Sequence, residues 1–332
     1  MNIRKPCNMA TLYSDIDRPI RMDSPEIVFW EALLSGDADK AKSLFREKKM
    51  YWDVPCAVDA PYGRFEGLDA IEEFVRGFLP RFRADSATLH PKFQTIANGR
   101  VALEAYVDFA VDGMIEQVPF FLVADFRTPK LLEEVRLYTH FSYVPCLTPY
   151  RAPIFPSAHL EMGDPGLLTG PMRAYYEALH HAPLCDADAI HRCFAPDCRV
   201  GGYEPWTAPL RTPETDPGVS EGFAKGLATY IPACVGMRYE TIVDDGRTCV
   251  IEWVHIVSRR GREERNRVAM SGVSAYERDD EGRLCSVRIC DYAGHEGEIN
   301  WDALPITKEE AQAVNFVEAF PAGCGRKPQV EP

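Results

Sequence analysis

The chain has 332 residues, 46% of them hydrophobic and 26% charged, which is typical of globular protein and sufficient for two cores of ordinary size. Its formal net charge of −13 repels nucleic-acid phosphates and anionic membrane surfaces, so we expect neither nucleic acid nor membrane as a partner. Eleven scattered cysteines suggest free thiols in a reducing compartment, which predicts a cytoplasmic protein.

The first helix of the chain is predicted to follow an N-terminal arm, residues 1–23. Ser24, Pro25 and Glu26 supply a capping hydroxyl, a proline at the first helical position and an acid near the positive helix end. Apolar residues then recur at helical spacing as far as Gly36, where the pattern breaks.

Two further helices and a run of strands complete the first half. The pattern predicts helices over 38–46 and 68–82. Between them, a strand-like segment leads into a wide turn over 53–67, which is rich in Pro, Gly and Asp. The remaining segments alternate like antiparallel strands, over 90–98, 100–112, 116–126 and 131–144. Helices followed by strands predict an α+β fold, with helices packed on one face of a curved antiparallel sheet.

The second half of the chain repeats the first. Residues 29–45 and 175–194 share an aromatic residue, Glu-Ala-Leu, an Asp-Ala-Asp and an apolar stripe that ends in Phe. Three further matches follow in the same order along the chain. Glu66-Gly67 matches Glu221-Gly222, residues 101–104 match 249–252, and residues 134–138 match 286–290. The spacing ranges from 146 residues (Glu31 to Glu177) to 155 (Glu66 to Glu221). A nearly constant spacing is typical of a duplicated domain.

We therefore predict two tandem domains, residues 24–145 and 170–300. A proline-rich linker over 146–169 joins them, and a C-terminal helix and tail follow over 301–332. Strands such as 100–109 and 249–257 carry apolar residues on both faces, so one face should line a pocket and the other should pack on a partner. The simplest partner is the sister domain, which predicts a pseudo-dimer within one chain with Glu104 and Glu252 near the interface; the chain could also form a homodimer.

Each half, on these motifs and this order of elements, resembles a nuclear-transport-factor-two-like domain. This is the cone-shaped α+β roll of the ketosteroid isomerases and SnoaL-like polyketide cyclases. The resemblance covers about 125 residues of each half and implies a sheet curled around a deep apolar pocket that accepts a small hydrophobic ligand.

The isomerase resemblance implies a base on the first strand and a tyrosine on the first helix. In the first copy the base falls on Asp53, but the tyrosine position is Phe29. In the second copy the tyrosine is Tyr175, but the base position is Gly202. The second acid falls near Val123 in one copy and at Ser274 in the other, so neither half keeps the full set.

The cyclase resemblance implies a carboxylate on the last strand, which is Asp291. Asp291 is at even spacing from Ile289 and therefore on the same strand face. His255 likewise shares a face with Trp253, so an imidazole and a carboxylate could enter one cavity and exchange protons. Aromatic side chains expected to line the pockets and bind substrate are Trp253, Trp30, Trp52, Tyr62 and Trp206.

Each of these residues also has a structural interpretation. Asp53 could be a surface turn residue, Tyr175 a core aromatic, and His255 a buried neutral histidine bonded to backbone. Asp291 fits such a role least well, because a buried carboxylate needs a partner.

Metal and cofactor sites have little support in the sequence. Cys185, Cys193 and Cys198 lack the close pairing of zinc ligands, although His180, His181 and His191 are nearby. Phosphate-loop, GxGxxG and GxSxG motifs do not occur in a usable context, so we expect no metal and no cofactor. Two hypotheses remain: a cofactor-independent isomerase, cyclase or dehydratase acting on a small apolar carbonyl or hydroxyl compound, and a non-catalytic tandem module that binds ligand in an apolar pocket.

Overall fold

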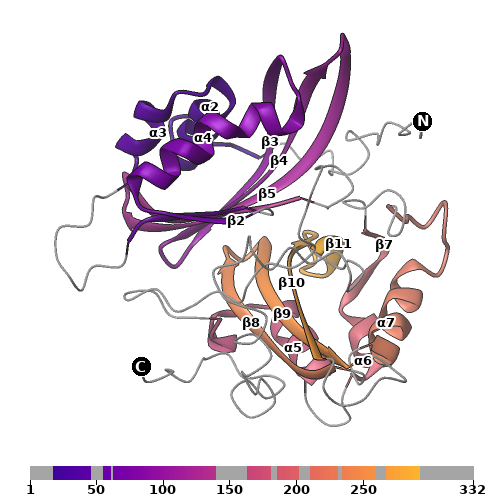
Figure 1. Cartoon of the computed structure of the whole chain (residues 1–332). Coiled ribbons are helices and arrows are strands. Elements are labelled where there is room, and N and C mark those ends of the chain that lie inside the picture. Colours follow the sequence, from indigo (N-terminus) through magenta and orange to yellow (C-terminus); the bar gives the residue numbers. More distant parts are fainter. Residues whose placement is uncertain are drawn as a thin grey trace. The chain divides into compact units, whose positions relative to one another are not determined.

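The computed structural model describes residues 18–45, 55–60, 63–139, 163–180, 185–201, 210–230, 234–258 and 267–291. The chain divides into two compact units, unit 1 from Met1 to Leu147 and unit 2 from Thr148 to Pro332, and each is described by itself (Figure 1). Both units are mixed α+β structures in which helices cover one face of a sheet, as the order of predicted elements indicated.

Unit 1 has three described helices, α2 (Pro25–Ser35), α3 (Ala38–Ser43) and α4 (Leu68–Phe82). The predicted capping role of the Ser24 hydroxyl is wrong: Ser24 occupies the cap position, but its Oγ donates to Glu26 Oε1 at 2.6 Å instead of accepting a backbone N–H. Gly36 ends α2 in the left-handed conformation, at φ 69°, which a glycine adopts without strain.

The sheet of unit 1 has six strands in the order β2-β1-β6-β5-β4-β3. Their bounds are β1 Ala57–Ala60, β2 Gly63–Glu66, β3 Ser86–Ala97, β4 Arg100–Val111, β5 Met114–Thr128 and β6 Leu131–Tyr138. The four predicted strands correspond to β3 through β6, which form an antiparallel meander.

Two expectations for this sheet need correction. The segment predicted as a wide turn contains the antiparallel pair β1 and β2. The sheet is also not wholly antiparallel, because β1 runs parallel to β6, with Ala57 opposite Glu134. The long connection through α4 and four strands, β2 to β5, lets β1 enter beside the last strand in the same direction, which a short turn could not do.

Unit 2 repeats this order of elements. Its helices are η2 (Pro165–Leu167), α5 (Pro171–His180), α6 (Ala187–Arg192) and α7 (Val219–Tyr230). Its strands are β7 Phe194–Val200, β8 Cys234–Asp244, β9 Thr248–Ser258, β10 Arg267–Arg278 and β11 Leu284–Asp291. They form the sheet β7-β11-β10-β9-β8, with β7 parallel to β11 as β1 is to β6. Residues just before α5 bond to β8, through Gly163 N to Glu240 O at 2.8 Å and Thr169 N to Asp244 Oδ2 at 2.9 Å.

An ion pair fixes the correspondence between the two sheets. In unit 1, Arg136 of β6 donates to Asp125 of β5 at 2.8 Å; in unit 2, Arg288 of β11 donates to Glu277 of β10 at 2.9 Å. Each residue of the unit 2 pair comes 152 positions after its counterpart in unit 1 (288 − 136 and 277 − 125). The predicted match of Gly67 with Gly222 is wrong, because Gly67 precedes α4 whereas Gly222 lies inside α7. The glycine that precedes α7 is Gly218.

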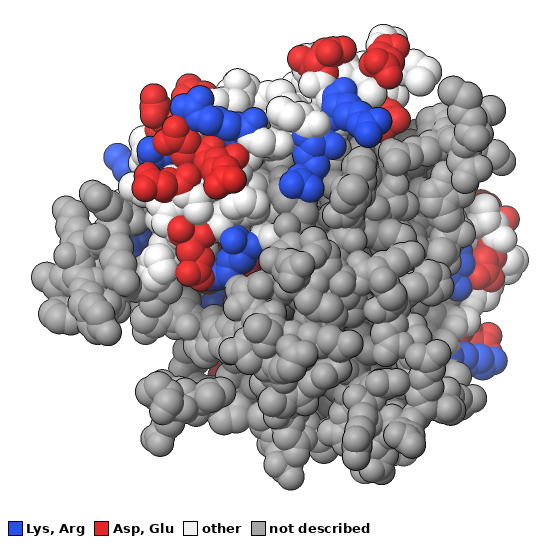
Figure 2. Space-filling view, viewed as in Figure 1, with Lys and Arg blue, Asp and Glu red and all other residues white. Residues whose placement is uncertain are grey.

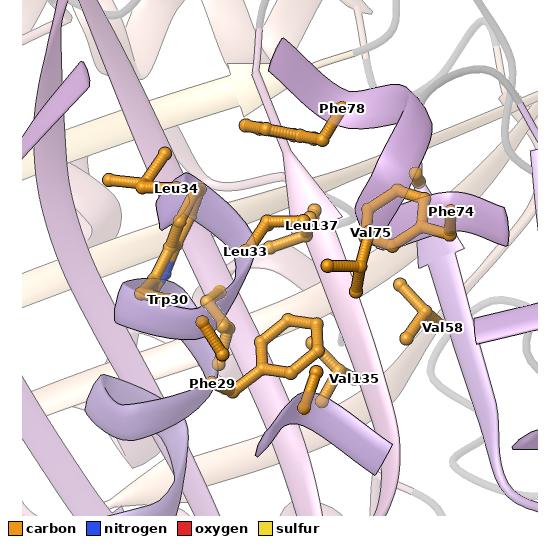
Figure 3. Packing of buried hydrophobic residues seen from close by; sticks show 14 of the residues in the cluster. Phe29, Trp30, Leu33, Leu34, Val58, Phe74, Val75, Phe78, Val135 and Leu137 are labelled. Atoms are coloured by element: carbon orange, nitrogen blue, oxygen red, sulfur yellow. The ribbon is translucent and has the colours of Figure 1, made fainter. Parts of the chain in front are cut away.

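The core of unit 1 lies between the helices and the inner sheet face. Phe29, Trp30 and Leu33 of α2 and Phe74 and Phe78 of α4 point toward the sheet (Figure 3). Aromatic rings of this core are in direct contact. The Phe82 and Phe109 rings, for example, stack with their centroids 4.3 Å apart. The opposite side of the helices carries charges of both signs, with Lys42 2.6 Å from Glu72, and the blue and red side chains interleave over α3 and α4 (Figure 2).

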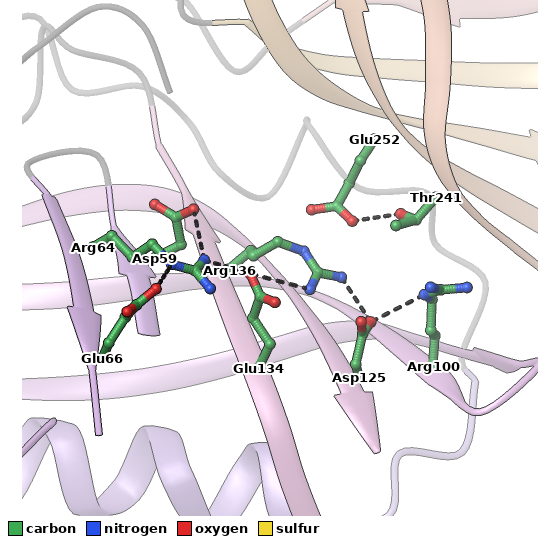
Figure 4. Close-up of polar contacts among 9 residues, drawn as sticks. All are labelled: Asp59, Arg64, Glu66, Arg100, Asp125, Glu134, Arg136, Thr241 and Glu252. Atoms are coloured by element: carbon green, nitrogen blue, oxygen red, sulfur yellow. Dashed lines mark hydrogen bonds and ion pairs between the residues drawn. The ribbon is translucent and has the colours of Figure 1, made fainter. Parts of the chain in front are cut away.

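The outer sheet face of unit 1 carries buried charged side chains among apolar ones. Asp125 interrupts the apolar run of β5 because its Oδ1 accepts from Arg100 at 3.0 Å and from Arg136 at 2.8 Å (Figure 4). Burial raises the pKa of Asp125, but the charges and hydrogen bonds of Arg136 and Arg100 outweigh this and hold it below its ordinary value. Glu104 in unit 1 and Glu252 in unit 2 are also buried, and Glu252 accepts a hydrogen bond from Thr241. The packing of the two sheets against each other stays a prediction.

Candidate functional site

A cluster of hydrogen-bonded side chains lies on the inner face of the unit 2 sheet. Strand β10 contributes Gly272, Ser274 and Tyr276, which share one face because side chains alternate along a strand. Tyr276 belongs to the apolar core of unit 2, and Ser274 is 2% exposed. The sequence pattern singled out only Ser274; the period-two row Gly-x-Ser-x-Tyr is the signal that would have found the others.

Trp253 of β9 joins this row from the neighbouring strand. It is the direct cross-strand partner of Gly272, and its indole Nε1 donates to Ser274 Oγ at 2.9 Å. A Cβ on Gly272 would meet the Trp253 ring and lie 2.9 Å from the Cys290 carbonyl oxygen. The glycine therefore leaves the space that the indole occupies. On the other side of Gly272, its partner in β11 is Asp291, so Trp253, Gly272 and Asp291 form one row across three strands.

Tyr175 of α5 meets the same cluster from above the sheet. Its ring centroid is 5.2 Å from that of Tyr276, and the two hydroxyls are hydrogen-bonded. Tyr276 also accepts a hydrogen bond from Ser274. The network thus links the Trp253 N–H, the Ser274 hydroxyl and both phenols. We call these four residues, Tyr175, Trp253, Ser274 and Tyr276, the hydroxyl cluster.

Burial keeps the phenols of the cluster protonated. It raises the pKa of Tyr276 to about 12, even though the hydrogen bonds with Tyr175 and Ser274 act in the opposite direction. The pKa of Tyr175 lies well above its ordinary value, first because of burial and then because of the neighbouring Tyr276 and Tyr239. At neutral pH these groups are therefore hydrogen-bond donors and acceptors, not bases.

A second aromatic group borders the cluster. Tyr176 stacks on His180 with centroids 4.2 Å apart, and Tyr239 of β8 meets both rings edge-on, at 5.5 and 5.4 Å. His180 Nδ1 lies 3.0 Å from the Tyr176 carbonyl oxygen, so this part of α5 is tied to its own backbone.

The matching positions of unit 1 are apolar. When the two units are aligned so that Asp125 matches Glu277, Leu122 matches Ser274 and Ala124 matches Tyr276. The sequence predicts this position near Val123; Val123 itself lies on the outer face with Asp125, and the counterpart of Ser274 is Leu122, one residue earlier. On α2, Phe29 is buried at the position of Tyr175. Trp30 is fully buried among Phe78 and Phe120, at 6.0 and 5.1 Å, and its Nε1 has no hydrogen-bond partner.

The structure brings together some of the predicted site residues. Tyr175 and Trp253 belong to the hydroxyl cluster, whereas Trp30 lies in unit 1. His255 occupies a described position of β9, where it pairs with Met270 and Met237, and Asp291 is the last residue of β11. The side chains of His255 and Asp291 lie outside what the structure describes. Four further predicted residues lie outside the described residues altogether: Asp53, Trp52, Tyr62 and Trp206.

The chemistry available to the cluster is hydrogen bonding in an apolar enclosure. Neutral phenols in a low-dielectric site stabilise a developing oxyanion more strongly than they would in water. Within the described part of the chain, no group of three or more His, Cys, Asp or Glu residues could hold a metal ion. Among the helices that the structure describes, none is both long and apolar enough to cross a membrane.

Comparisons with known proteins place this chain beside one group of folds. No protein-family model matches the chain, and the search of curated proteins gives no match. A Catenulispora acidiphila protein with a ketosteroid isomerase-like fold, in complex with trimethylamine, is 14% identical, with a TM-score of 0.31, over 40% of this chain and 98% of its own. An NTF2-like protein of unknown function from Cytophaga hutchinsonii is 12% identical, with a TM-score of 0.26, over 37% of this chain and 93% of its own.

A third structure in this group comes from Sinorhizobium meliloti and is described as a possible polyketide cyclase. It is 13% identical, with a TM-score of 0.26, over 34% of this chain and 92% of its own. The structural neighbours are thus NTF2-like, isomerase-like and cyclase-like proteins, each matched over about a third of this chain.

Proposed function

We propose that unit 2 binds a small, largely apolar carbonyl or hydroxyl compound and moves a proton on it without a cofactor, as an isomerase, cyclase or dehydratase. The observation that supports this most is the hydroxyl cluster, a hydrogen-bonded set of donors within an apolar core. A buried polar network of this kind is costly unless its groups are satisfied, and a substrate oxygen can serve as one of the partners.

In this proposal the proton is carried by Asp291. Its backbone lies in the row of Trp253 and Gly272, at the end of β11. A carboxylate at this position would take a proton from the substrate and return it, as a general acid–base group does. His255, two residues beyond Trp253 on β9, would be its partner or shuttle. Tyr175 and Tyr276 would donate hydrogen bonds to the substrate oxygen and stabilise the enolate.

We further propose that the two units are tandem copies of one cone-shaped roll, bounded by residues 24–145 and 170–300, and that unit 2 is the working copy. The shared strand order and the equivalent ion pairs Asp125–Arg136 and Glu277–Arg288 support the duplication. The apolar residues of unit 1 at the positions of the hydroxyl cluster support the assignment to unit 2. Asp53, with Trp30 and Trp52 as walls, would be the base of the first pocket only if that copy is also active.

The test is proton exchange, which requires no knowledge of the product. The chain is incubated in D₂O with a panel of cyclic and aromatic ketones, and deuterium incorporation next to the carbonyl is followed by NMR. Asp291→Asn should slow exchange by on the order of 100-fold or more, because that is the usual cost of losing a general base. Tyr276→Phe should slow it less, and Asp53→Asn, the matched control in unit 1, should leave it unchanged.

Full exchange in both aspartate variants would show that the assigned roles are wrong. Loss in Asp53→Asn alone would move the activity to unit 1. If ketones bind without any exchange, the alternative function applies: a pocket that binds or senses a hydrophobic ligand, for which affinity should vary little with pH. Calorimetric titration over pH 5 to 9 measures that dependence.

A further inference from the structure

A second set of reactive side chains lies in unit 2, away from the residues of the hydroxyl cluster. Residues 218–222 read Gly-Val-Ser-Glu-Gly, which matches the pattern G-x-S-x-G of serine hydrolases. In those enzymes the serine lies on a sharp turn from a strand into a helix. Here a turn over 212–216 precedes the motif and Ser220 lies in the first turn of α7, but no strand leads into it among the described residues 210–218. The motif alone therefore does not identify a nucleophile, as the sequence already indicated.

Ser220 is paired with a histidine from another helix. Its Oγ lies 3.0 Å from Nδ1 of His191, in the last turn of α6. A hydroxyl and an imidazole within hydrogen-bond reach are the arrangement by which a serine is activated as a nucleophile. Ser220 is 8% exposed and His191 is exposed, so the pair lies at the protein surface.

A buried thiol completes the arrangement. Cys198 of β7 is fully buried and hydrogen-bonded to the Ser220 side chain. Burial raises the pKa of Cys198 above its ordinary value, although the bond with Ser220 opposes this. The thiol is therefore protonated at neutral pH, and Ser220 Oγ lies within hydrogen-bond reach of both Cys198 and His191 Nδ1.

The two glycines of the motif are not closely packed. A Cβ built on Gly222 meets nothing within 4 Å among the residues that the structure describes, and one on Gly218 meets Asp216 Oδ1 at 3.9 Å. Packing against the described residues therefore requires neither glycine. At the start of α7 the Val219 N–H donates to the Asp216 carbonyl oxygen and the Gly222 N–H to the Gly218 carbonyl oxygen. The N–H groups of Ser220 and Glu221 are therefore the ones placed to bind an oxygen that becomes negative.

We propose that Ser220 and His191 form a nucleophilic site that cleaves small acyl esters. Ser220 Oγ attacks the ester carbonyl carbon, and its proton passes to His191 Nδ1. The bond to the alkoxy group breaks, and that group leaves as the alcohol with the proton from His191. Water, deprotonated by His191, then cleaves the acyl-serine and releases the carboxylic acid, which restores the hydroxyl.

Charges of both signs surround Ser220. Glu221 follows the serine on an exposed position, and Lys225 lies 2.5 Å from it and lowers its pKa. Asp216, at the turn before α7, is likewise paired with Arg211 at 3.8 Å. These pairs leave no strong field of one sign near the serine, so small uncharged esters are the class to test first.

The experiment is covalent labelling of the full chain with a fluorophosphonate probe, followed by peptide mass spectrometry to locate the adduct. We expect the adduct on Ser220 in the unaltered protein. Hydrolysis of p-nitrophenyl acetate should fall by on the order of 100-fold in Ser220→Ala and in His191→Gln, in keeping with the loss of a nucleophile or its base. The matched control, Ser43→Ala, alters an exposed serine whose hydroxyl donates to the Lys40 carbonyl oxygen, and it should change nothing.

A folded, unaltered protein with no adduct on Ser220 would overturn the proposal, and this result does not depend on whether a variant folds. Ester hydrolysis that survives Ser220→Ala would also overturn it. Tyr276→Phe separates this site from the proton-transfer site, because it should leave both the labelling and the ester hydrolysis unchanged.

Discussion

Trp253 and Gly272 face each other across β9 and β10, and the indole ring lies over the glycine. In unit 1 the corresponding cross-strand pair is Ala105 and Phe120, so the large ring comes from the other strand. Phe120 there packs against Trp30 at 5.1 Å and fills the inner face with carbon. The exchange of large and small residues in one pair is what allows Trp253 to reach Ser274 in unit 2.

Gly272→Ala should destabilise unit 2. The added Cβ would lie 2.8 Å from Trp253 Cη2 and 2.9 Å from the Cys290 backbone oxygen, so either the ring or the strand must move. Overpacking of this kind costs roughly 1–3 kcal/mol. Urea denaturation followed by circular dichroism measures the change.

Gly226→Ala is the matched control for this substitution. Gly226 lies inside α7 with nothing within 4 Å of its ideal Cβ position, and alanine is a better helix former there. It should stabilise the unit by about 0.5–1 kcal/mol. Equal effects of the two substitutions would show that Trp253 does not occupy the space over Gly272.

The buried pair Glu277–Arg288 should show strong coupling. Both side chains are fully buried, and Arg288 also bonds to Ser286. Arg288→Met leaves the carboxylate without its charge partner, which costs about 3–5 kcal/mol at buried pairs. Adding Glu277→Gln should recover part of this loss, so the double variant should be more stable than the sum of the single changes predicts.

An exposed ion pair on α7 provides the comparison for the substitutions at Glu277 and Arg288. Lys225 and Glu221 lie 2.5 Å apart with both side chains more than half exposed. Lys225→Ala should change the free energy of unfolding by an amount near the error of measurement, because solvent screens such pairs. Additive effects of Glu277→Gln and Arg288→Met would contradict the pairing seen on the outer face of the sheet.

Stability of unit 2 should fall at high pH. Burial raises the pKa of Tyr276 to about 12, and it raises the pKa values of Tyr175 and Tyr239 well above their ordinary value. An unfolded tyrosine ionises near pH 10. The buried phenols therefore stabilise the fold fully below about pH 10, and this contribution is lost as the pH rises through about 12.

Absorbance at 295 nm, where phenolate absorbs, follows this titration. Exposed tyrosines should ionise near pH 10, and a second step should appear only as unit 2 unfolds. Tyr276→Phe should reduce the second step. A single step near pH 10 with the fold intact would contradict the burial of these hydroxyls.

Several cysteines of unit 2 should react slowly in the native protein. Burial raises the pKa of Cys193 to about 11 and that of Cys285 to about 12, and it raises the pKa of Cys249 well above its ordinary value. At pH 8 only about one Cys193 thiol in a thousand is then a thiolate, the reactive form. Alkylation with iodoacetamide, mapped by mass spectrometry, should label these positions mainly in denaturant; rapid native labelling of Cys249 would contradict its burial.

The helices and the central strands could be predicted because their periodicity is local. Phe74 and Phe78 recur at the spacing of a buried helix face, and α4 has the predicted bounds of 68–82. Tyr175 could be matched with Phe29 because the two residues stand at the same position of α5 and α2, whereas the role of Tyr175 stays a prediction. Within β10 the alternation of Gly272, Ser274 and Tyr276 was visible, but the sequence does not show which face of a strand is inward when both faces are buried.

The remaining features depend on contacts between distant segments. Nothing near Ala57 indicates that β1 pairs with β6, because the partner strand is 77 residues away (134 − 57). The pairing of Ser220 with His191 has the same cause, since α6 and α7 meet only in the folded unit. The match of Gly67 to Gly222 failed because glycines in different structural roles look alike in sequence.

The parallel strand pairs constrain how the chain can fold during synthesis. β1 can pair with β6 only after β6 has been synthesised. In the same way β7 can pair only after β11 has been synthesised, since Phe194 pairs with Leu284, 90 residues later (284 − 194). Contacts at such separation slow folding, because the loop must close before the pairing contributes any stability. Unit 1 should therefore remain incomplete on the ribosome until residues near Tyr138 leave the exit tunnel, and its β1–β2 hairpin is the segment most exposed to chaperones until then.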